Sequence, residues 1–258
     1  MKLLDFENTN IHYRVSGKGD PVIFLHGFLE NNSMWDAIAV EISSLGFKTI
    51  LVDLPCHGES RFDEEVCSMA FMADCINALC EAERFENPFV FGHSMGGYVG
   101  LELLKKRPIQ LTLVHSNFWN DPADKKKDRN RVVTIVESNK MRLINEAIPN
   151  LFAAKNRTKC ETIIGDLIAQ ATTIPSSEII ASTRGMRDRL HNGGLMEKHA
   201  VKMIHGSLDT VVKTEQLEQE LSLLKNQPTI QTIANAGHMS LWETPNALMK
   251  CIKLNLGL

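Results

Sequence analysis

The sequence predicts an α/β protein with a mostly parallel sheet flanked by helices and a helical insertion. Between positions 21 and 114, short apolar runs alternate with longer amphipathic stretches, which is typical of strand–helix–strand units around a parallel sheet. From 117 to 192 charged helical stretches follow one another without a strand signal. The 258 residues contain no Gly/Ser-rich linker, low-complexity tract or internal repeat, so we expect one domain that carries an insertion.

The apolar runs are the expected strands of the core. They cover 22–25, 49–52, 89–91, 111–114, 201–205 and 229–233. Helical spacing covers 35–45, 69–83, 98–107 and 215–224. Pro245 fits the first turn of a closing helix, because that turn does not need the N–H that proline lacks. We therefore expect an α/β core built from residues 1–116 and 193–258.

The insertion at 117–192 is expected to form a helical cap. Its helical stretches are 124–139, 157–171 and 178–189. Because it separates two strands of the sheet, it should lie over the carboxyl edge of the sheet, where open α/β folds bind their ligands. The insertion is therefore predicted to act as a lid.

Composition narrows the classes of function. The net charge is -3, and the dense basic run at 125–127 is flanked by Asp124 and Asp128, so we expect no nucleic-acid partner. No apolar run is long enough to span a membrane, and positions 1–10 lack the apolar stretch of a secretory signal. The six cysteines include no C-x-x-C pair and are expected to be free thiols. We expect a cytoplasmic protein with a small-molecule substrate and no membrane partner, and the sequence leaves the oligomeric state open.

The most informative motif is Gly92-His93-Ser94-Met95-Gly96, a G-x-S-x-G that follows an expected strand and opens an expected helix. This strand–turn–helix context is that of a nucleophile elbow, in which the serine hydroxyl is exposed above the sheet edge. The turn crowds the neighbouring backbone, so the flanking positions have no room for a Cβ atom, and both are glycine here. Ser94 is therefore the candidate nucleophile.

Two later loops offer the partners that a serine nucleophile needs. A serine hydroxyl requires a histidine base whose imidazole is held by a carboxylate, and after an elbow these follow in the order acid, histidine. Asp209 follows the strand expected at 201–205, and His238 follows the strand expected at 229–233. Taken singly, Asp209 fits a turn cap and His238 a surface histidine, but their joint order favours a triad with Ser94. His205 also ends a strand and is expected to be too buried to serve.

Two backbone N–H groups are expected to form an oxyanion hole. One belongs to Met95, the residue after the nucleophile, and the other to Phe28, in the loop after the first parallel strand. Gly27 lets the backbone turn there. The Phe28 side chain fits either a pocket wall or the core.

Together these motifs resemble the α/β-hydrolase fold family, in the group of capped esterases, lipases and C–C hydrolases. The matching stretches are 26–28, 53–60, 92–97, 206–209 and 237–238, which span nearly the whole chain outside the insertion. The family usually has glycine where Cys56 stands, so we expect a local change in turn geometry. The resemblance implies a structural role for the loop with Asp53 and His57. Ser94, in place of the aspartate of dehalogenase and epoxide-hydrolase relatives, argues against those two activities.

The leading hypothesis is a serine hydrolase that cleaves a small carboxylic ester or thioester through an acyl-enzyme, with no metal or cofactor. One alternative is a C–C bond hydrolase or menaquinone-pathway lyase on a carboxylate substrate. It requires a carboxylate-binding arginine over Ser94, for which the insertion offers Arg184, Arg187 and Arg189. A second alternative is a binding or receptor protein that retains the triad but turns over negligibly.

Apolar side chains of the insertion and of nearby loops are expected to form a hydrophobic acyl pocket, although each fits a place in the cap core equally well. The expected pocket residues, besides Phe28 and Met95, are Leu29, Phe118, Trp119, Phe152, Met186 and Val211.

Overall fold

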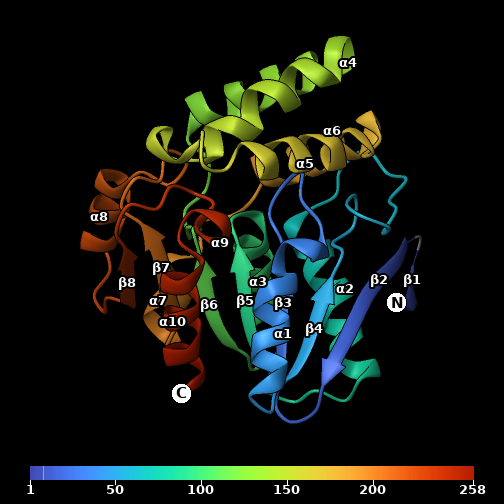
Figure 1. The fold of residues 1–258 in the computed structure, drawn as a ribbon. Helices are drawn as coiled ribbons and strands as arrows, with labels where there is room; N and C mark the ends of the chain where they lie inside the picture. Colours follow the sequence, from blue (N-terminus) through green and yellow to red (C-terminus); the bar gives the residue numbers. More distant parts are fainter. Residues whose placement is uncertain (8) are drawn as a thin grey trace.

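The computed structural model describes residues 1–7 and 9–258, and in this part of the chain eight strands form one mostly parallel sheet (Figure 1). The strands are β1 (Lys2–Phe6), β2 (Thr9–Gly17), β3 (Pro21–Leu25), β4 (Lys48–Val52), β5 (Phe89–His93), β6 (Gln110–Val114), β7 (Lys202–Gly206) and β8 (Thr229–Ile233). Their order is β1-β2-β4-β3-β5-β6-β7-β8. β2 pairs antiparallel with β1 and β4, and the other neighbours are parallel. The predicted fold class is confirmed.

Helices cover both faces of the sheet (Figure 1). α1 (Asp36–Ser44) and α10 (Pro245–Leu256) pack on one face, and α2 (Met69–Ala82) and α3 (Met95–Leu104) pack on the other. Neighbouring residues of one strand enter different cores, because successive side chains of a strand point to opposite faces. Thus Ile23 belongs to the core under α2 and α3, whereas Phe24 belongs to the core under α1 and α10. The remaining core helices are α7 (Gly193–Lys198), α8 (Thr214–Ser222) and the short α9 (Ser240–Glu243).

The two N-terminal strands were not predicted. The signal was present, since Ile11, Tyr13 and Val15 alternate with polar residues along β2 and pack into the core. β1 has little buried surface, and it extends the sheet by pairing with β2. These strands lie far from the carboxyl ends of β5 to β8 and do not contribute to the site.

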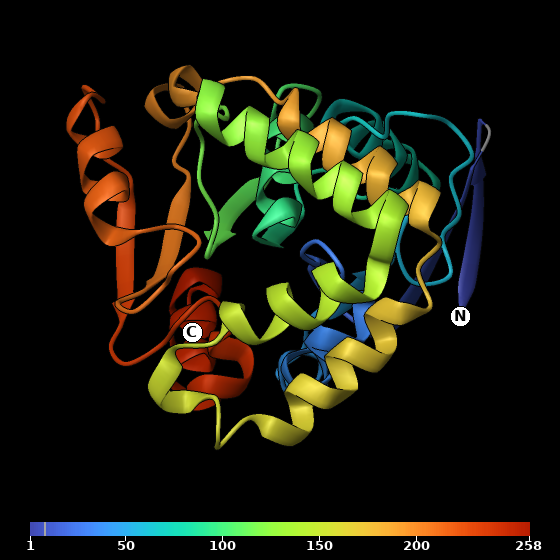
Figure 2. The same ribbon diagram turned by 90° about the horizontal axis from the view of Figure 1, so that it is seen from above.

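A helical insertion follows β6 and lies over the carboxyl edge of the sheet (Figure 1, Figure 2). It consists of α4 (Ala123–Leu151), α5 (Glu161–Thr172) and α6 (Ser176–Arg187). α4 leaves the helical conformation at Asn139, with φ -159° and ψ 86°. The Asn139 side-chain oxygen accepts a hydrogen bond from the Arg142 N–H at 3.1 Å and so caps the second segment. The predicted helix at 124–139 is the first segment, and the second was not predicted.

The cap has an apolar cluster of its own, formed mainly by α4, α5 and α6. Leu29 and Met239, from loops at the sheet edge, belong to the same cluster, so the cap is packed onto the core. The division of the chain at 116 and 193 remains a prediction. None of the described helices is both long and apolar enough to cross a membrane, and all six cysteines are free.

Ion pairs join the two ends of the insertion. The buried carboxylate of Asp121 accepts from Arg189 at 2.7 Å and from Arg129 on α4 at 3.0 Å. The Arg189 guanidinium lies 4.2 Å from the centre of the Tyr98 ring and donates to the Trp119 carbonyl. Because Tyr98 belongs to α3, these contacts tie the ends of the cap to the helix that begins at the elbow.

Candidate active site

Ser94 lies on the sharp turn between β5 and α3. Its backbone adopts φ 48° and ψ -111°, a sparsely populated conformation that costs of order 1–3 kcal/mol. A Cβ atom on Gly92 would lie 2.4 Å from the Gly96 carbonyl oxygen, and one on Gly96 would lie 2.5 Å from the Leu25 carbonyl oxygen. The two glycines therefore permit the turn, and the side chain of Ser94 remains partly exposed.

Asp209 and His238 form a short buried hydrogen bond. His238 Nδ1 donates to Asp209 Oδ2 at 2.8 Å, and the other carboxylate oxygen accepts from the N–H groups of Val211 and Val212. Burial alone would raise the pKa of the Asp209 carboxyl. The charge of His238 and the hydrogen bonds from His115 and His238 nevertheless hold that pKa well below its usual range. Asp209 is therefore an ionised acceptor at neutral pH.

A cavity of about 200 Å³ contains both Ser94 and His238. Among the described residues, neither Ser94 Oγ nor His238 Nε2 has a hydrogen-bond partner, so both atoms are free for a proton transfer. Phe28 lines the same cavity. Met95 begins α3, so its N–H has no acceptor within the helix. These positions suit the two expected oxyanion donors.

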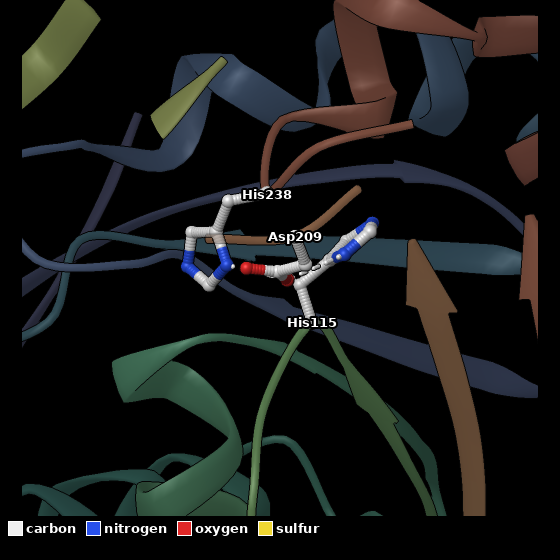
Figure 3. A group of neighbouring side chains, drawn as sticks. All are labelled: His115, Asp209 and His238. Carbon is white, nitrogen blue, oxygen red and sulfur yellow. Dashed lines mark hydrogen bonds and ion pairs between the residues drawn. The ribbon is translucent and has the colours of Figure 1, made fainter. Parts of the chain in front are cut away.

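A second histidine, His115, contacts the same aspartate as His238 (Figure 3) and is itself hydrogen-bonded to a serine. His115, just after β6, has its Nδ1 3.2 Å from Asp209 Oδ2, and its Nε2 lies 2.6 Å from Ser240 Oγ. The ring nitrogens and the carboxylate are also close enough to suit a metal ion, but both Nδ1 atoms already contact one carboxylate oxygen. Ser240 has no exposed surface and does not line the cavity, whereas Ser94 does. Ser94 is the serine that a substrate can reach.

His115 was not among the residues predicted from the sequence. It directly follows the apolar run at 111–114, so it stands at a strand end as His238 does. Burial lowers the pKa of His115 to about 4, although the hydrogen bond that His115 donates to Asp209 opposes this shift. His115 is therefore neutral at pH 7.

A buried ion pair connects the loop after β3 with the elbow. Glu30 Oε2 accepts from the Gly27 N–H at 2.7 Å and lies 3.1 Å from His93 Nδ1. The other ring nitrogen of His93 donates to the carbonyl of His238 at 2.9 Å. Burial works against both charges, yet the attraction between them raises the pKa of His93 and lowers the pKa of Glu30. With an acceptor at each nitrogen, His93 is an imidazolium.

Comparison with known proteins gives the same assignment as the fold. A family model described as alpha/beta hydrolase fold matches residues 20–124. A thermophilic esterase from Thermogutta terrifontis superposes with a TM-score of 0.88 and 25% identity, over 96% of this chain and 93% of that one. AB hydrolase superfamily protein YisY of Bacillus subtilis is 24% identical over 249 residues, which are 92% of this chain and 91% of the relative. Over 112 residues, 42% of each chain, identity is 36% to the pimeloyl-[acyl-carrier protein] methyl ester esterase of Nitrosomonas europaea. These matches show that the chain has the α/β-hydrolase fold.

The loop at 53–60 is held by hydrogen bonds to Asp53, whose carboxylate accepts from the N–H groups of Asn32 and Glu59. The His57 ring nitrogen Nδ1 donates to the Pro55 carbonyl. Cys56 is buried and adopts φ 72°, a left-handed conformation that glycine takes without strain. The loop thus keeps a backbone that glycine would favour, which corrects the expected change in turn geometry.

The predicted pocket residues divide into two groups. Leu29, Met186 and Val211 line the cavity with Ser94, together with residues of α4. Phe118 and Phe152 lie outside it, because both are fully buried in apolar clusters, and Phe152 packs against the ring of Trp242. Trp119 also lies outside it and faces a larger neighbouring cavity.

The three arginines that the alternative of a carboxylate substrate would need over Ser94 point elsewhere. Arg184 pairs with Glu65, Arg187 pairs with Asp188, and Arg189 is buried against Asp121. Arg129 lines the cavity with Ser94 instead. Sequence reasoning missed it because its direction depends on how α4 packs over the sheet edge.

Because Glu30 and His93 form a buried ion pair, we expect substitutions of the two residues to have non-additive effects on the free energy of unfolding. The size of this coupling should depend on pH. Removing one partner, by Glu30→Gln or His93→Asn, should lower the free energy of unfolding by about 3–5 kcal/mol, because it leaves the other buried and unpaired. The double variant should lose less than the sum of the two. Urea denaturation of the four proteins at pH 6 measures this coupling.

The direction of each pKa shift sets the pH range of that coupling. The raised pKa of His93 stabilises the fold below its unfolded value of about 6.5, and this contribution is lost as pH rises through the folded pKa. The lowered pKa of Glu30 stabilises above about pH 4.5 and is lost as pH falls through the folded pKa. The coupling should therefore be largest between about pH 4.5 and 6.5 and smaller at pH 9. Additive single effects, or equal coupling at pH 6 and pH 9, would contradict the ion pair.

Proposed function

We propose that this chain is a serine hydrolase that cleaves a small carboxylic ester or thioester through an acyl-enzyme. The observation that carries the proposal is the placement of Ser94, which faces a cavity shared with His238 from a strained turn. His238 is in turn held by Asp209. Esterases among the similar proteins support an ester as the substrate.

In the first half-reaction, Ser94 Oγ attacks the ester carbonyl carbon while His238 Nε2 takes the hydroxyl proton. The Nδ1–H···Asp209 hydrogen bond keeps the ring in the tautomer that leaves Nε2 free, and it stabilises the imidazolium. The N–H groups of Phe28 and Met95 receive the negative oxygen of the tetrahedral intermediate. Collapse breaks the bond to the alcohol or thiol, which takes the proton from His238 and leaves Ser94 acylated.

In the second half-reaction, water attacks the acyl carbon and gives a proton to His238. A second tetrahedral intermediate forms in the same oxyanion site. Its collapse returns the proton to Ser94 Oγ and releases the carboxylic acid. One ester and one water thus give one acid and one alcohol, with the chain unchanged.

The cavity favours a short to medium acyl chain. Its volume is about 200 Å³, and its walls include Leu29, Leu143, Ile148 and Met186. Each methylene that finds such a surface adds roughly 0.8 kcal/mol of binding, whereas one that does not fit adds nothing. Because α4 contributes Leu143 and Ile148, the cap sets the length of chain that fits.

Arg129 favours a substrate that also carries a negative charge. Its Nε donates to Asp121, while its two terminal nitrogens have no partner in the part of the chain that the structure describes. Asp121 also pairs with Arg189, so two guanidiniums share one carboxylate and leave a net positive charge. The alternative of C–C hydrolysis or a lyase step on a carboxylate substrate also requires a positive charge of this kind near Ser94. A larger cavity of about 710 Å³ adjoins this one and shares Arg129, which gives room for the rest of such a substrate.

Ser94→Ala should remove the nucleophile and lower kcat by about 10³-fold or more, with an unchanged circular dichroism spectrum. A fluorophosphonate probe should modify the wild type once, and peptide mass spectrometry should place the label on Ser94. Ser207→Ala, an exposed serine on the loop after β7, serves as the control and should keep full labelling. A label on Ser240 would overturn the nucleophile assignment. If the wild type shows neither labelling nor turnover, the binding-protein alternative is favoured.

Arg129→Ala should discriminate between charged and neutral substrates. With p-nitrophenyl hemisuccinate, kcat/KM should fall about 10- to 100-fold, because a hydrogen bond to a charged group contributes about 1.5–3 kcal/mol. With p-nitrophenyl butyrate, of similar length and no charge, the change should stay within about threefold. Arg142→Ala, on the exposed side of α4 where Arg142 pairs with Glu146, is the matched control. Equal losses on both esters would show that Arg129 does not recognise the charge.

A further inference from the structure

His115 and Ser240 have no part in the reaction steps above. Both are nevertheless fully buried, and His115 contacts Asp209. His115 adopts φ 48°, which is uncommon for a residue other than glycine. Its N–H donates to the Ile204 carbonyl on β7 at 2.8 Å, so the backbone is fixed next to the strand that leads to Asp209. A Cβ atom on Gly206 would lie 2.9 Å from the His115 ring, so the ring uses space that glycine leaves there.

Chemistry fixes the direction of each hydrogen bond in this group. Ionised Asp209 can only accept, so His115 Nδ1 carries the proton and donates. Neutral His115 then has a bare Nε2, which accepts the hydroxyl proton of Ser240 at 2.6 Å. The chain therefore runs from Ser240 through His115 to Asp209.

The contacts occupy the whole carboxylate of Asp209. One oxygen accepts from the N–H groups of Val211 and Val212, and the other accepts from His115 and His238. A carboxylate offers about four acceptor positions, two on each oxygen, so none is left vacant. Figure 3 shows the two histidines on either side of this carboxylate.

We propose that His115, held by Ser240, is a positioning residue that fixes the orientation of Asp209 and limits the negative charge that Asp209 lends to His238. Without His115, one acceptor position of a buried carboxylate is empty, so the carboxylate can rotate and interacts more strongly with His238. A stronger interaction favours the imidazolium and makes His238 a poorer base in the acidic range. The inference rests on the proposed roles of Asp209 and His238.

Other titratable groups around His115 and His238 stay the same in the test. The ring of His93 on β5 lies 5.9 Å from the His115 ring, between centroids, and forms an ion pair with Glu30. His205 on β7 bonds to Thr214. Glu243 on α9 accepts from the N–H groups of the His238 loop. None of these contacts involves the His115 ring nitrogens.

The test compares His115→Ala with His115→Asn. Asparagine tolerates the left-handed backbone, and its amide nitrogen takes the place of Nδ1, so it keeps the donor to Asp209. We expect His115→Ala to lower kcat about 10- to 100-fold with KM for p-nitrophenyl butyrate unchanged, since neither His115 nor Ser240 lines the cavity. The acid limb of kcat/KM should move to higher pH by about 0.5 unit or more. His115→Asn should restore most of kcat and return the acid limb.

A matched control separates positioning from packing. His205→Gln also removes a buried histidine from the end of a neighbouring strand, but one that bonds to Thr214. It should lower stability and leave the acid limb in place. Equal losses in the Ala and Asn variants of His115, or an acid limb that does not move in His115→Ala, would overturn the proposal.

Side-chain ¹⁵N spectra of the histidines test the same contacts without turnover. At pH 7 His115 should be in the neutral form with its proton on Nδ1, and Ser240→Ala should shift its Nε2 resonance. A His115 with its proton on Nε2 would contradict the proposed chain. If the wild type proves inactive, the proposed function fails while these spectra still decide the role of His115. If the wild type is active and His115→Ala behaves like it, the positioning role fails alone.

Discussion

The site depends on the hydrogen bonds that the buried carboxylate of Asp209 accepts. Its four hydrogen bonds come from its own loop, from His238 after β8 and from His115 after β6, so it joins three strand ends at one edge of the sheet. A buried charge is stable only when it is paired and hydrogen-bonded, and here each acceptor position is used. The order of β5, β6, β7 and β8 in the sheet makes this possible, because adjacent parallel strands bring Ser94, His115, Asp209 and His238 together.

A second buried contact, the ion pair of Glu30 and His93, lies on the other side of His238. Glu30 holds the loop after β3 through the Gly27 N–H, and His93 ties the elbow to the backbone of His238. The loops that carry Phe28, Ser94 and His238 are thus connected by hydrogen bonds through Glu30 and His93. Such a connection keeps the groups in place before the substrate arrives, and preorganised donors are worth most where water is excluded.

Sequence patterns predicted what depends on local spacing. The elbow at Ser94 was visible because glycines must flank the turn, and Asp209 and His238 were visible because each follows a strand late in the chain. The N-terminal strands were missed, although the alternation of Ile11, Tyr13 and Val15 indicated one of them. Residues that act through tertiary contacts were not predictable in this way. His115 gains its partners only when β6, β7 and the His238 loop are adjacent, and Arg129 reaches the cavity only because α4 packs over the sheet edge.

Asp209→Asn tests whether this carboxylate orients His238 for catalysis by Ser94. Asparagine has the same shape, but its amide group favours the wrong tautomer of the imidazole. The measurement is kcat for p-nitrophenyl butyrate at pH 7, with circular dichroism to verify the fold. We predict a loss that approaches about 10⁴-fold, the size of this effect in a serine protease. A loss of less than about tenfold in a folded variant would contradict this role of Asp209 and would mean that another group orients the base.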